Sequence, residues 1–365
     1  MKEFRDRRVI AGLLRKISRQ ARRAGPPVRL MEVCGTHTMT IHRYGLHPLL
    51  LGAGVEMMSG PGCPVCITPD AHHRAAIGLV TRRENLVLAA FGDITRVPTT
   101  EGSLQTAVPA PRSRVQVVYS PQDALETARR KPESEVVFFG AGFETTIPSI
   151  ALAVKQAAGQ NLKNFSLLPA LWLIPPPLRA LLDSKEVRIQ GFLYPGHVTA
   201  VIGTAAYDFV AAEYGLPGAV AGFEPADILL AVSSVLDRIL RGEPGVDNEY
   251  RRVVREGGNP RARALMEEVL EVTDAVWRGL GFIPRSGLRL RKRFQGFDAP
   301  GRFGLKVEAA SDELPGCRCG EVLRGVISPP ECRLFGRTCR PEAPRGPCMV
   351  SPEGSCLVYH KYSKQ

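Results

Sequence analysis

Cysteine is absent from the long middle of this chain, because none of its nine cysteines lies between Cys66 and Cys317. Three occur early and six crowd the C-terminal end: Cys34, Cys63 and Cys66, then Cys317, Cys319, Cys332, Cys339, Cys348 and Cys356. Cysteines that only fill a core would be scattered through the strands and helices. The gap excludes that use and indicates metal or redox chemistry at two places in the sequence.

Long apolar runs are also absent. No stretch of about 18 apolar residues occurs, so the sequence predicts no membrane span. The first ten residues, MKEFRDRRVI, lack the apolar run that a signal peptide requires. We therefore expect a cytoplasmic protein that does not associate with membranes. Thiols stay reduced in that compartment, so the cysteines are expected to be metal ligands or a transient redox pair rather than structural disulfides.

Aromatic residues are scarce, at 7%, and no RNA-binding motif with interleaved aromatic and basic residues occurs. The net charge is nevertheless +12 and is concentrated in residues 1–29 and 285–306. Basic faces of this kind suit acidic or nucleic-acid partners. Without an aromatic motif, a solvated basic helix and hairpin is favoured, and no nucleic-acid partner is expected. A chain of 365 residues with 44% apolar content is long enough for two or three soluble domains.

Short apolar runs alternate with Gly/Pro loops and helical segments along most of the chain. The expected strands span residues 28–33, 86–91, 115–120, 135–139, 165–174 and 189–194. Such alternation is typical of parallel α/β sheets with helices on their faces. The tripeptide Gly-Phe-Glu occurs at 142–144 and again at 222–224, each time before an apolar helix. We therefore expect an α/β fold with two Rossmann-like lobes whose parallel sheets face a cleft.

Four segments are predicted along the chain. A basic amphipathic helix comes first, followed by two α/β domains and by a helical, cysteine-rich domain. The predicted boundaries are 1–25, 26–118, 119–235 and 236–365. In open α/β sheets, ligands bind beyond the carboxyl ends of the strands. The polar loops that carry Cys34, Glu144 and His197 lie at such ends, so we expect these side chains to share a site.

Three acidic residues, Asp93, Glu144 and Glu224, follow predicted strands. Each could act as an acid, a base or a hydrogen-bond anchor, and a Glu near a helix start could equally serve the helix dipole. The loop after the strand at 135–139, GAGFETT, is rich in glycine but lacks the lysine of a phosphate-binding P-loop. Nucleotide binding at this loop is therefore not supported.

The early cysteines form two motifs. Cys63 and Cys66 make a Cys-x-x-Cys turn that contains Pro64, and such a turn forms a reversible disulfide or shares a metal. Cys34 and His37 make a Cys-x-x-His motif, in which the imidazole can join the thiolate on a metal or act as its base. Together the four have the ligand set of a structural zinc site. That alternative stays open, although such sites usually belong to small zinc-dependent domains.

The remaining histidines are less specific. His42, His47, His72 and His73 have no spacing that favours a metal site, and we expect surface or capping roles for them.

The late cysteines begin with Cys-x-Cys and continue at irregular spacings. A zinc ribbon would show paired Cys-x-x-Cys knuckles, and none is present here. Irregularly spaced thiolates in a Gly/Pro-rich backbone favour an iron–sulfur cluster, and a [4Fe–4S] cluster needs four of them. A zinc site is the alternative. Six candidates exceed four, so two cysteines are expected to have another role.

Several motifs together make the sequence recognisable. They are Cys34-Gly35-Thr36-His37, the GPGCPVC run at 60–66, GFETT at 142–146, PGHV at 195–198 and ECRLFG at 331–336. In this combination, from about residue 30 to about residue 360, the chain resembles the HypD family of [NiFe]-hydrogenase maturation factors.

The resemblance implies a function that the residues alone do not name. Members of that family are scaffolds on which the Fe(CN)₂CO unit of the hydrogenase is assembled, with Fe(II) as substrate and cyanide and CO as its ligands. It implies a small HypC-type chaperone as partner, HypE as cyanide donor together with HypF, and a [4Fe–4S] cluster as cofactor. A maturation scaffold with redox chemistry is thus expected rather than a stand-alone turnover enzyme.

Carried over by motif, the resemblance assigns roles to single residues. Cys34 would be the iron ligand in the cleft, and His37 would orient it or tune its protonation. Cys63 and Cys66 would be the redox pair in a relay from the cluster to the iron. The expected cluster ligands are Cys317, Cys332, Cys339 and Cys356, with Cys319 and Cys348 as the candidates to replace them.

Two other functional classes stay open from the sequence. One is a thiol–disulfide or iron–sulfur oxidoreductase that acts on a small substrate. The other is a zinc-stabilised binding protein whose basic faces meet RNA or acidic proteins.

Overall fold

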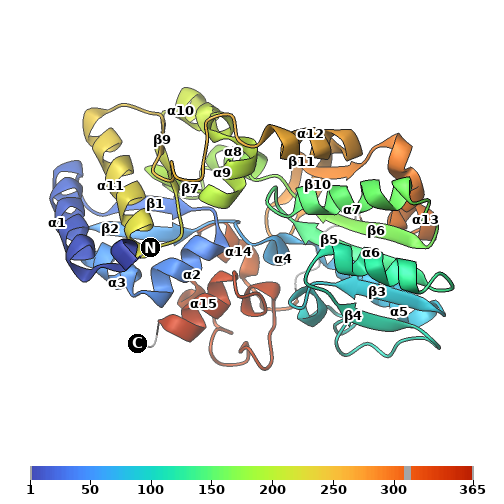
Figure 1. The fold of residues 1–365 in the computed structure, drawn as a ribbon. Coiled ribbons are helices and arrows are strands. Elements are labelled where there is room, and N and C mark those ends of the chain that lie inside the picture. The colour runs from blue at the N-terminus through green and yellow to red at the C-terminus, as the bar shows by residue number, and fades with distance from the viewer. Residues whose placement is uncertain (1, 308–313, 364–365) are drawn as a thin grey trace.

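The computed structural model describes residues 2–307 and 314–363 of the chain. Two parallel sheets lie side by side, each with its own helices, and the C-terminal cysteine-rich segment packs below the region where they meet (Figure 1). The expected α/β class with parallel sheets is confirmed. In the part of the chain that the structure describes, no helix is long and apolar enough to cross a membrane.

The first sheet has five strands in the order β2-β1-β7-β8-β9, and all neighbours are parallel. Its strands are β1 (Val28–Glu32), β2 (Val55–Ser59), β7 (Gly191–Pro195), β8 (Gly218–Ala221) and β9 (Val246–Asn248). Its helices are α1 (Arg7–Ala24), α2 (Gly35–Arg43), α3 (Leu46–Gly52), α9 (Gly196–Ile202), α10 (Asp208–Tyr214) and α11 (Pro225–Arg241). We call this sheet with its helices the five-stranded half.

The second sheet has four parallel strands in the order β4-β3-β5-β6. Its strands are β3 (Leu86–Ala90), β4 (Arg114–Val117), β5 (Glu135–Gly142) and β6 (Phe165–Leu171). An antiparallel hairpin and five helices accompany it: β10 (Leu270–Trp277), β11 (Gly281–Leu290), α5 (Asp70–Arg82), α6 (Pro121–Arg130), α7 (Ile147–Gly159), α12 (Pro260–Val269) and α13 (Ala299–Phe303). We call this assembly the four-stranded half.

Short elements connect the two halves. Helix α8 (Pro175–Ser184) contacts both α10 and β11. Helix α4 (Pro64–Ile67) lies between the halves, next to the C-terminal segment (Figure 1). That segment is largely irregular and contains α14 (Cys319–Leu323) and α15 (Ser355–Tyr362), the second of which packs on α2.

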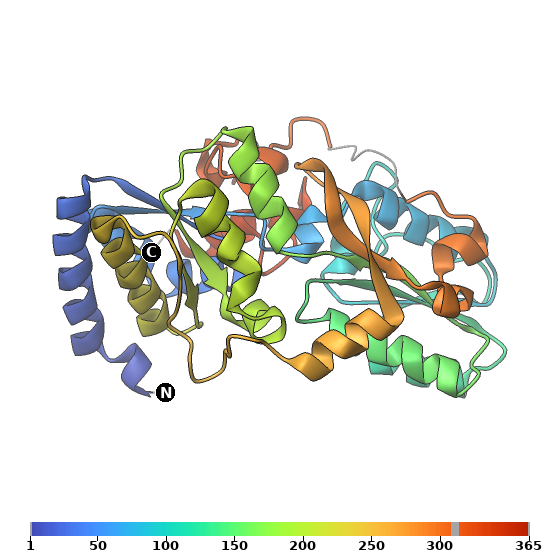
Figure 2. The ribbon, with the colours of Figure 1, turned by 90° about the horizontal axis from the view of Figure 1, so that it is seen from above.

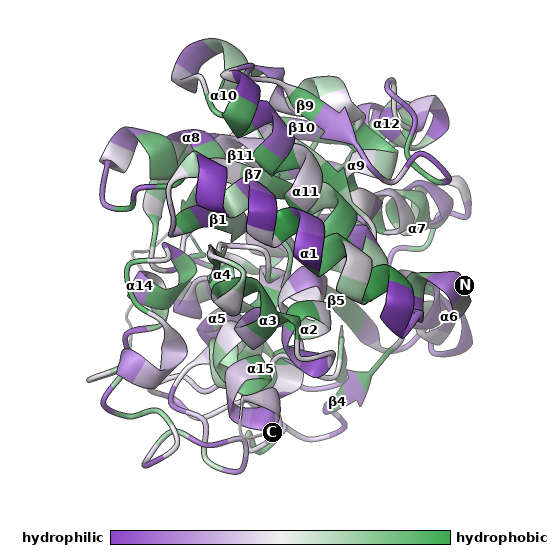
Figure 3. Ribbon diagram, turned by 90° about the vertical axis from the view of Figure 1, so that its left-hand side faces the viewer, coloured by the Kyte–Doolittle hydropathy of each residue, from purple (hydrophilic) through white to green (hydrophobic). Residues whose placement is uncertain are grey.

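The predicted basic helix forms as α1, and its ends have clear local causes. The side chain of Asp6 accepts the backbone N–H groups of Arg8 and Val9, which satisfies donors that the first helical turn leaves free. The helix ends at Gly25, whose φ of 88° suits glycine. The apolar side of α1 packs on α11 (Figure 2), while polar residues occupy its outward side (Figure 3).

The strands do not follow the consecutive division expected at 26–118 and 119–235. The five-stranded sheet takes β1 and β2 from the first stretch and β7 and β8 from the second, while the consecutive strands β3–β6 of the other sheet span the boundary at residue 118. Glu144 follows β5 and His197 follows β7, which places them in different halves. Helix α11 and strand β9 extend the five-stranded half beyond residue 235. A strand that is buried on both faces has a continuous apolar sequence. Such a sequence does not show to which of the two sheets the strand belongs.

Candidate functional site

Cys34 lies at the carboxyl end of β1, where it caps the start of α2. It is 3% exposed, and its backbone N–H donates to Glu32 Oε2 at 2.8 Å. The glycine-rich turn before Cys63 packs directly on it, since a Cβ atom on Gly62 would overlap the backbone of Cys34. The Cys-x-x-His and Cys-x-x-Cys loops are therefore in contact, and only glycine permits this approach at residue 62.

His197 is one side chain near Cys34 that could take its proton. It stands at the start of α9, directly after β7, and β7 is the neighbour of β1 in the sheet. The distance from Cys34 Sγ to His197 Nδ1 is 4.0 Å. Burial lowers the pKa of His197 to about 4, so its ring is neutral near pH 7 and can accept a proton. The structure thus brings together these two residues that sequence analysis placed in one site.

His37 has a different environment. Its Nε2 lies 3.3 Å from the backbone oxygen of Ala221 at the end of β8, and its ring is 5.1 Å from that of Phe223. Burial, with a smaller effect from His197, lowers the pKa of His37 to about 3. A neutral, fully buried imidazole bound to the sheet backbone holds α2 in position, and this is how His37 can orient Cys34.

Two buried carboxyl groups flank Cys34. Burial raises the pKa of Glu32 to about 8, although Thr38 and the backbone N–H of Cys34 both donate to it. Glu353 comes from the C-terminal segment and accepts the Thr36 hydroxyl at 2.9 Å. Burial, followed by the charges of Glu353 and Glu32, raises the pKa of the Cys34 thiol well above its usual value. This environment keeps the thiol protonated until a cation offsets the negative charge.

Cys63 and Cys66 form a disulfide across α4. Cys63 caps this helix, and its Sγ accepts the backbone N–H of Cys66 at 3.1 Å, while Pro64 begins the helical turn. Both residues are buried. Because these two sulfurs are bonded to each other, the four-residue zinc site with Cys34 and His37 is not formed in this structure.

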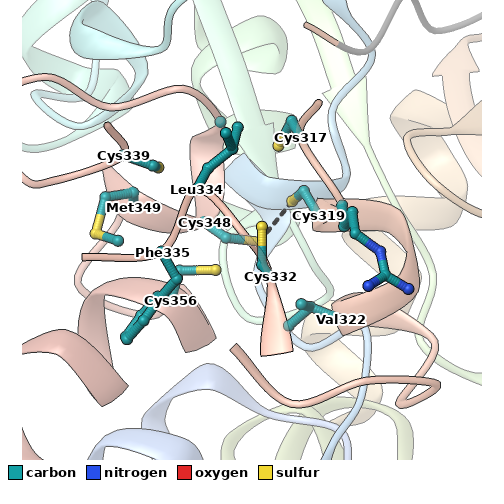
Figure 4. A pocket seen from close by; sticks show the side chains of 12 residues that line it. Cys317, Cys319, Val322, Cys332, Leu334, Phe335, Cys339, Cys348, Met349 and Cys356 are labelled. Atoms are coloured by element: carbon teal, nitrogen blue, oxygen red, sulfur yellow. Dashed lines mark hydrogen bonds between the residues drawn. The ribbon is translucent and has the colours of Figure 1, made fainter. Parts of the chain in front are cut away.

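All six late cysteines line one pocket (Figure 4). Cys319 and Cys348 lie deepest, and their sulfur atoms are 2.7 Å apart. Cys317, Cys332 and Cys356 are only partly buried, and Cys339 is 8% exposed. Burial therefore distinguishes Cys319 and Cys348 from the four more exposed cysteines, while side-chain hydrogen bonds also join Cys319 to Cys317 and Cys348 to Cys356.

The late cysteines differ in how well their surroundings suit anionic sulfur. Hydrogen bonds with neighbouring thiols, together with burial, raise the pKa of Cys317 and Cys348, and burial raises the pKa of Cys339. Hydrogen bonds with Cys317 and Cys348, together with the nearby charge of Arg278, lower the pKa of the Cys319 thiol well below its usual value. The backbone N–H of Arg345 donates to Cys339 Sγ at 3.3 Å. A Cβ on Gly346 would lie 2.6 Å from Cys317 Sγ, so glycine keeps the space beside that sulfur open.

The donor set fits an iron–sulfur cluster better than a single ion. Among the residues that the structure describes, no three His, Cys, Asp or Glu side chains converge as the ligands of one metal ion do. The ligands of a [4Fe–4S] cluster instead bind separate irons and stand around a volume. The two most buried sulfurs, those of Cys319 and Cys348, are 2.7 Å apart and suit a thiol pair, and the four more exposed cysteines would then be available to hold a cluster.

A buried junction connects the two cysteine groups. Helix α4 contacts the turn at Pro347–Met349, which carries Cys348. Arg278, from the end of the β10–β11 hairpin, donates its backbone N–H to Ile67 O at 2.8 Å and its Nε to Thr68 O at 3.1 Å. It also forms an ion pair with Asp70 at the start of α5. The disulfide segment is therefore fixed beside the late cysteines by charged and backbone contacts.

Glu144 lies on the other side of the interior, at the carboxyl end of β5. Its Oε1 accepts the backbone N–H of Ile174 at 3.0 Å, and Oε2 has no partner among the described residues. Burial raises the pKa of Glu144 to about 7. The pKa of Tyr207 is raised by burial and, to a smaller extent, by the charges of Glu144 and Cys34. The ring of Tyr207 thus lies near both residues, although they belong to different halves.

The other acidic candidates have structural partners. Asp93 Oδ2 accepts the Ser351 hydroxyl at 3.1 Å and so contacts the C-terminal segment. Glu224 caps the start of α11 and pairs with Arg5.

The four remaining histidines pack in the interior. His42 stacks on His47, with ring centroids 4.7 Å apart, and contacts Tyr359. His72 and His73 are buried on α5 against Trp172 and Phe139. The surface or capping roles expected for His72 and His73 are therefore wrong. Neutral imidazoles pack well on aromatic rings, and their sequence positions do not reveal this.

Glu353 and Arg278 were not identified from the sequence. Glu353 sits between Pro352 and Gly354 in an irregular segment, and Arg278 belongs to a hairpin turn. The one available signal for Glu353 is its place between the last two cysteines.

Known proteins are similar to this chain over nearly its whole length. A family model described as HypD, "Hydrogenase formation hypA family", matches residues 8–363. The chain belongs to the HypD family. It is 47% identical to "Hydrogenase maturation factor HypD" of Rhodobacter capsulatus, over 99% of this chain and 97% of that protein. It is 42% identical to the protein of the same name from Escherichia coli K12, over 98% and 95% of the two chains.

Proposed function

We propose that this protein acts in [NiFe]-hydrogenase maturation as the scaffold on which the Fe(CN)₂CO unit is assembled. Its family and its nearly full-length similarity to proteins named hydrogenase maturation factors support the general role. The observation that carries the specific role is the placement of Cys34 beside His197, in contact with a second loop whose disulfide adjoins a six-cysteine pocket.

Cys34 is the proposed iron ligand. A soft thiolate suits low-spin Fe(II) that carries cyanide and CO. The thiol must lose its proton when iron binds, and His197 Nδ1 is placed to receive it at 4.0 Å. A cation that binds beside Cys34 also favours ionisation of the buried Glu32 carboxyl group, whose pKa burial has raised to about 8.

Cys63 and Cys66 are the proposed redox pair. Opening their disulfide breaks the S–S bond and consumes two electrons and two protons. A thiolate of the Cys319–Cys348 pair can supply both electrons by attacking this disulfide, which leaves Cys319 and Cys348 joined to each other. The contact between α4 and the Cys348 turn supports this exchange.

The four outer cysteines would hold a [4Fe–4S] cluster: Cys317, Cys332, Cys339 and Cys356. When bound, such a cluster supplies or accepts electrons singly. The backbone N–H at Arg345 stabilises negative charge on Cys339, and Gly346 leaves space beside Cys317. A HypC-type chaperone and HypE, as cyanide donor, are the proposed partners.

Metal and sulfide analysis of protein purified without oxygen tests the cofactor. About four irons with matching acid-labile sulfide, and an EPR signal on reduction, support the cluster. Zinc without sulfide would instead favour the zinc-stabilised binding protein. Further iron with infrared bands in the cyanide and CO stretching region supports the scaffold.

The redox role is tested by Cys63→Ala in cells that make a [NiFe]-hydrogenase. We expect hydrogenase maturation to be lost, while Cys63→Ala protein still folds and still contains iron and sulfide. Normal maturation would exclude the redox pair. Turnover of a small thiol or disulfide substrate by the isolated protein would favour the oxidoreductase alternative.

A further inference from the structure

The segment between Cys348 and Cys356 packs on Gly35 and Thr36, the two residues that follow Cys34. We call its residues 350–353 the strap. Val350 and Ser351 are buried, at 2% and 1% exposure, whereas Pro352 is exposed. The inner side of the strap therefore faces the interior and its outer side faces solvent. Cys34 is only 3% exposed, and Glu353 of the strap lies close enough for its charge, after burial, to raise the pKa of the Cys34 thiol.

One end of the strap is held by the five-stranded half. The Thr36 hydroxyl donates to Glu353 Oε1 at 2.9 Å. A Cβ on Gly35 would overlap the backbone and side chain of Glu353, so the strap lies directly on the residue next to Cys34. Glycine at residue 35 permits this close covering.

The other end is held by the four-stranded half. The Ser351 hydroxyl donates to Asp93 Oδ2 at 3.1 Å, and Arg96 Nη2 donates to Val350 O at 3.1 Å. Asp93 and Arg96 follow β3, the central region of the second sheet. The strap thus connects both halves beside the residues that follow Cys34.

The strap differs from the other walls around Cys34 in how it is attached. The turn at 60–62 is tied to its neighbours by backbone hydrogen bonds, from Gly60 N–H to Glu32 O at 2.8 Å and from Gly35 N–H to Gly62 O at 3.0 Å. Among the described residues, the backbone hydrogen bonds of the strap stay within the segment 346–358. Its links to the two halves all involve a side chain, so it can lift without breaking a sheet or a helix.

We propose that the strap is the access gate to Cys34, and that Thr36, Asp93 and Arg96 are the positioning residues that hold it closed. A reagent or an iron unit reaches the thiol when these three hydrogen bonds open together. The identity of the molecule that passes the gate rests on the proposed function. The existence of the gate is independent of that function, because access to the Cys34 thiol can be measured without iron.

The gate is tested by the rate at which iodoacetamide alkylates Cys34 in the folded, full-length protein. Peptide mass spectrometry follows Cys34 separately from the other thiols, and rates at several pH values allow the thiolate fraction to be divided out. We expect Ser351→Ala and Thr36→Val each to raise the rate about five-fold, the usual effect of one lost hydrogen bond. Arg96→Gln should act in the same direction.

Thr40→Val is the matched control. Thr40 lies on the same helix as Thr36, and its hydroxyl donates to Phe223 O rather than to the strap. We expect Cys34 in this variant to react at the wild-type rate. Equal acceleration in Thr36→Val and Thr40→Val, or no acceleration in Ser351→Ala, would overturn the gate. If Thr36→Val does not fold, Ser351→Ala decides the question alone.

The two proposals fail separately. Faster alkylation in the strap variants supports the gate even if no iron with cyanide and CO bands is found. If the protein carries iron with cyanide and CO bands but the strap variants do not change the alkylation rate of Cys34, the gate is excluded and the scaffold function is still supported.

Discussion

Arg278 and Asp70 form an ion pair in the interior, where their side chains are 3% and 0% exposed. Arg278 comes from the β10–β11 hairpin and Asp70 from the start of α5, and the charge of Arg278 also acts on Cys319. The pair therefore stands between the Cys63–Cys66 disulfide and the late cysteines. Its removal has consequences for stability that an exposed ion pair would not have.

Arg278→Met should lower the free energy of unfolding by about 1.5–3 kcal/mol, because it removes a buried cation that is hydrogen-bonded to Asp70 and to Thr68 O. Urea denaturation measures the change. Arg130→Met is the control, since the Arg130–Glu126 pair is 76% and 42% exposed and such a pair contributes about 0.3–0.5 kcal/mol. A similar small loss in both variants would contradict a structural role for the buried pair.

Gly62→Ala should destabilise the protein by about 1–3 kcal/mol, because the added Cβ would overlap the backbone of Cys34 and push the two loops apart. Gly78→Ala is the matched control. Gly78 lies inside α5 with open space around it, and alanine there should stabilise the helix by up to about 1 kcal/mol. Thermal unfolding distinguishes the opposite signs.

Glu144 should make stability depend on pH. Its pKa in the folded protein is about 7, above the ordinary value of 4.5, so the folded state binds this proton more tightly than the unfolded state does. Stability from this group is fully present below about pH 4.5 and is lost as the pH rises toward and through 7. The loss is on the order of 3 kcal/mol.

Urea denaturation between pH 5 and 8 measures this effect. We expect Glu144→Gln to show a flatter dependence than the wild type, since glutamine does not titrate. Parallel curves for the two proteins would show that Glu144 is not the group responsible.

Alanine variants of the six late cysteines should fall into two classes that differ in how much iron the purified protein contains. Alanine at Cys332 should remove most iron and acid-labile sulfide from protein purified without oxygen, because a cluster ligand is lost. Alanine at Cys348 should leave iron content close to that of the wild type, since Cys348 belongs to the close inner pair. Loss of iron in the Cys348→Ala variant alone would reverse the assignment.

Some of this site could be predicted from the sequence. Cys34 and His197 both follow apolar strands, and the carboxyl ends of parallel strands share an edge, which is enough to place them together. The two-residue spacing between Cys63 and Cys66 predicts that their sulfur atoms lie close enough to form a disulfide. These predictions succeed because the relevant constraints are local or follow from the strand pattern.

Other parts of the site depend on packing between distant segments. Glu353 reaches Thr36 only because α15 packs on α2, and Arg278 reaches Asp70 only because a hairpin folds across α5.

Strand β2 was not expected, since its sequence VEMMS mixes polar and apolar residues at the edge of a sheet. The local sequence of such a segment does not show which of the two halves it packs against.

The order of strands in the five-stranded sheet also governs how the chain can fold as it is synthesised. Strands β1 and β2 are made early, but their sheet is completed only when β9 at residue 248 has been made. The early strands must therefore remain unfinished while the entire four-stranded sheet emerges after them. The five-stranded half is therefore not a contiguous unit that could fold first, and a ribosome-bound fragment that ends before β7 should leave an open sheet edge for a chaperone to shield.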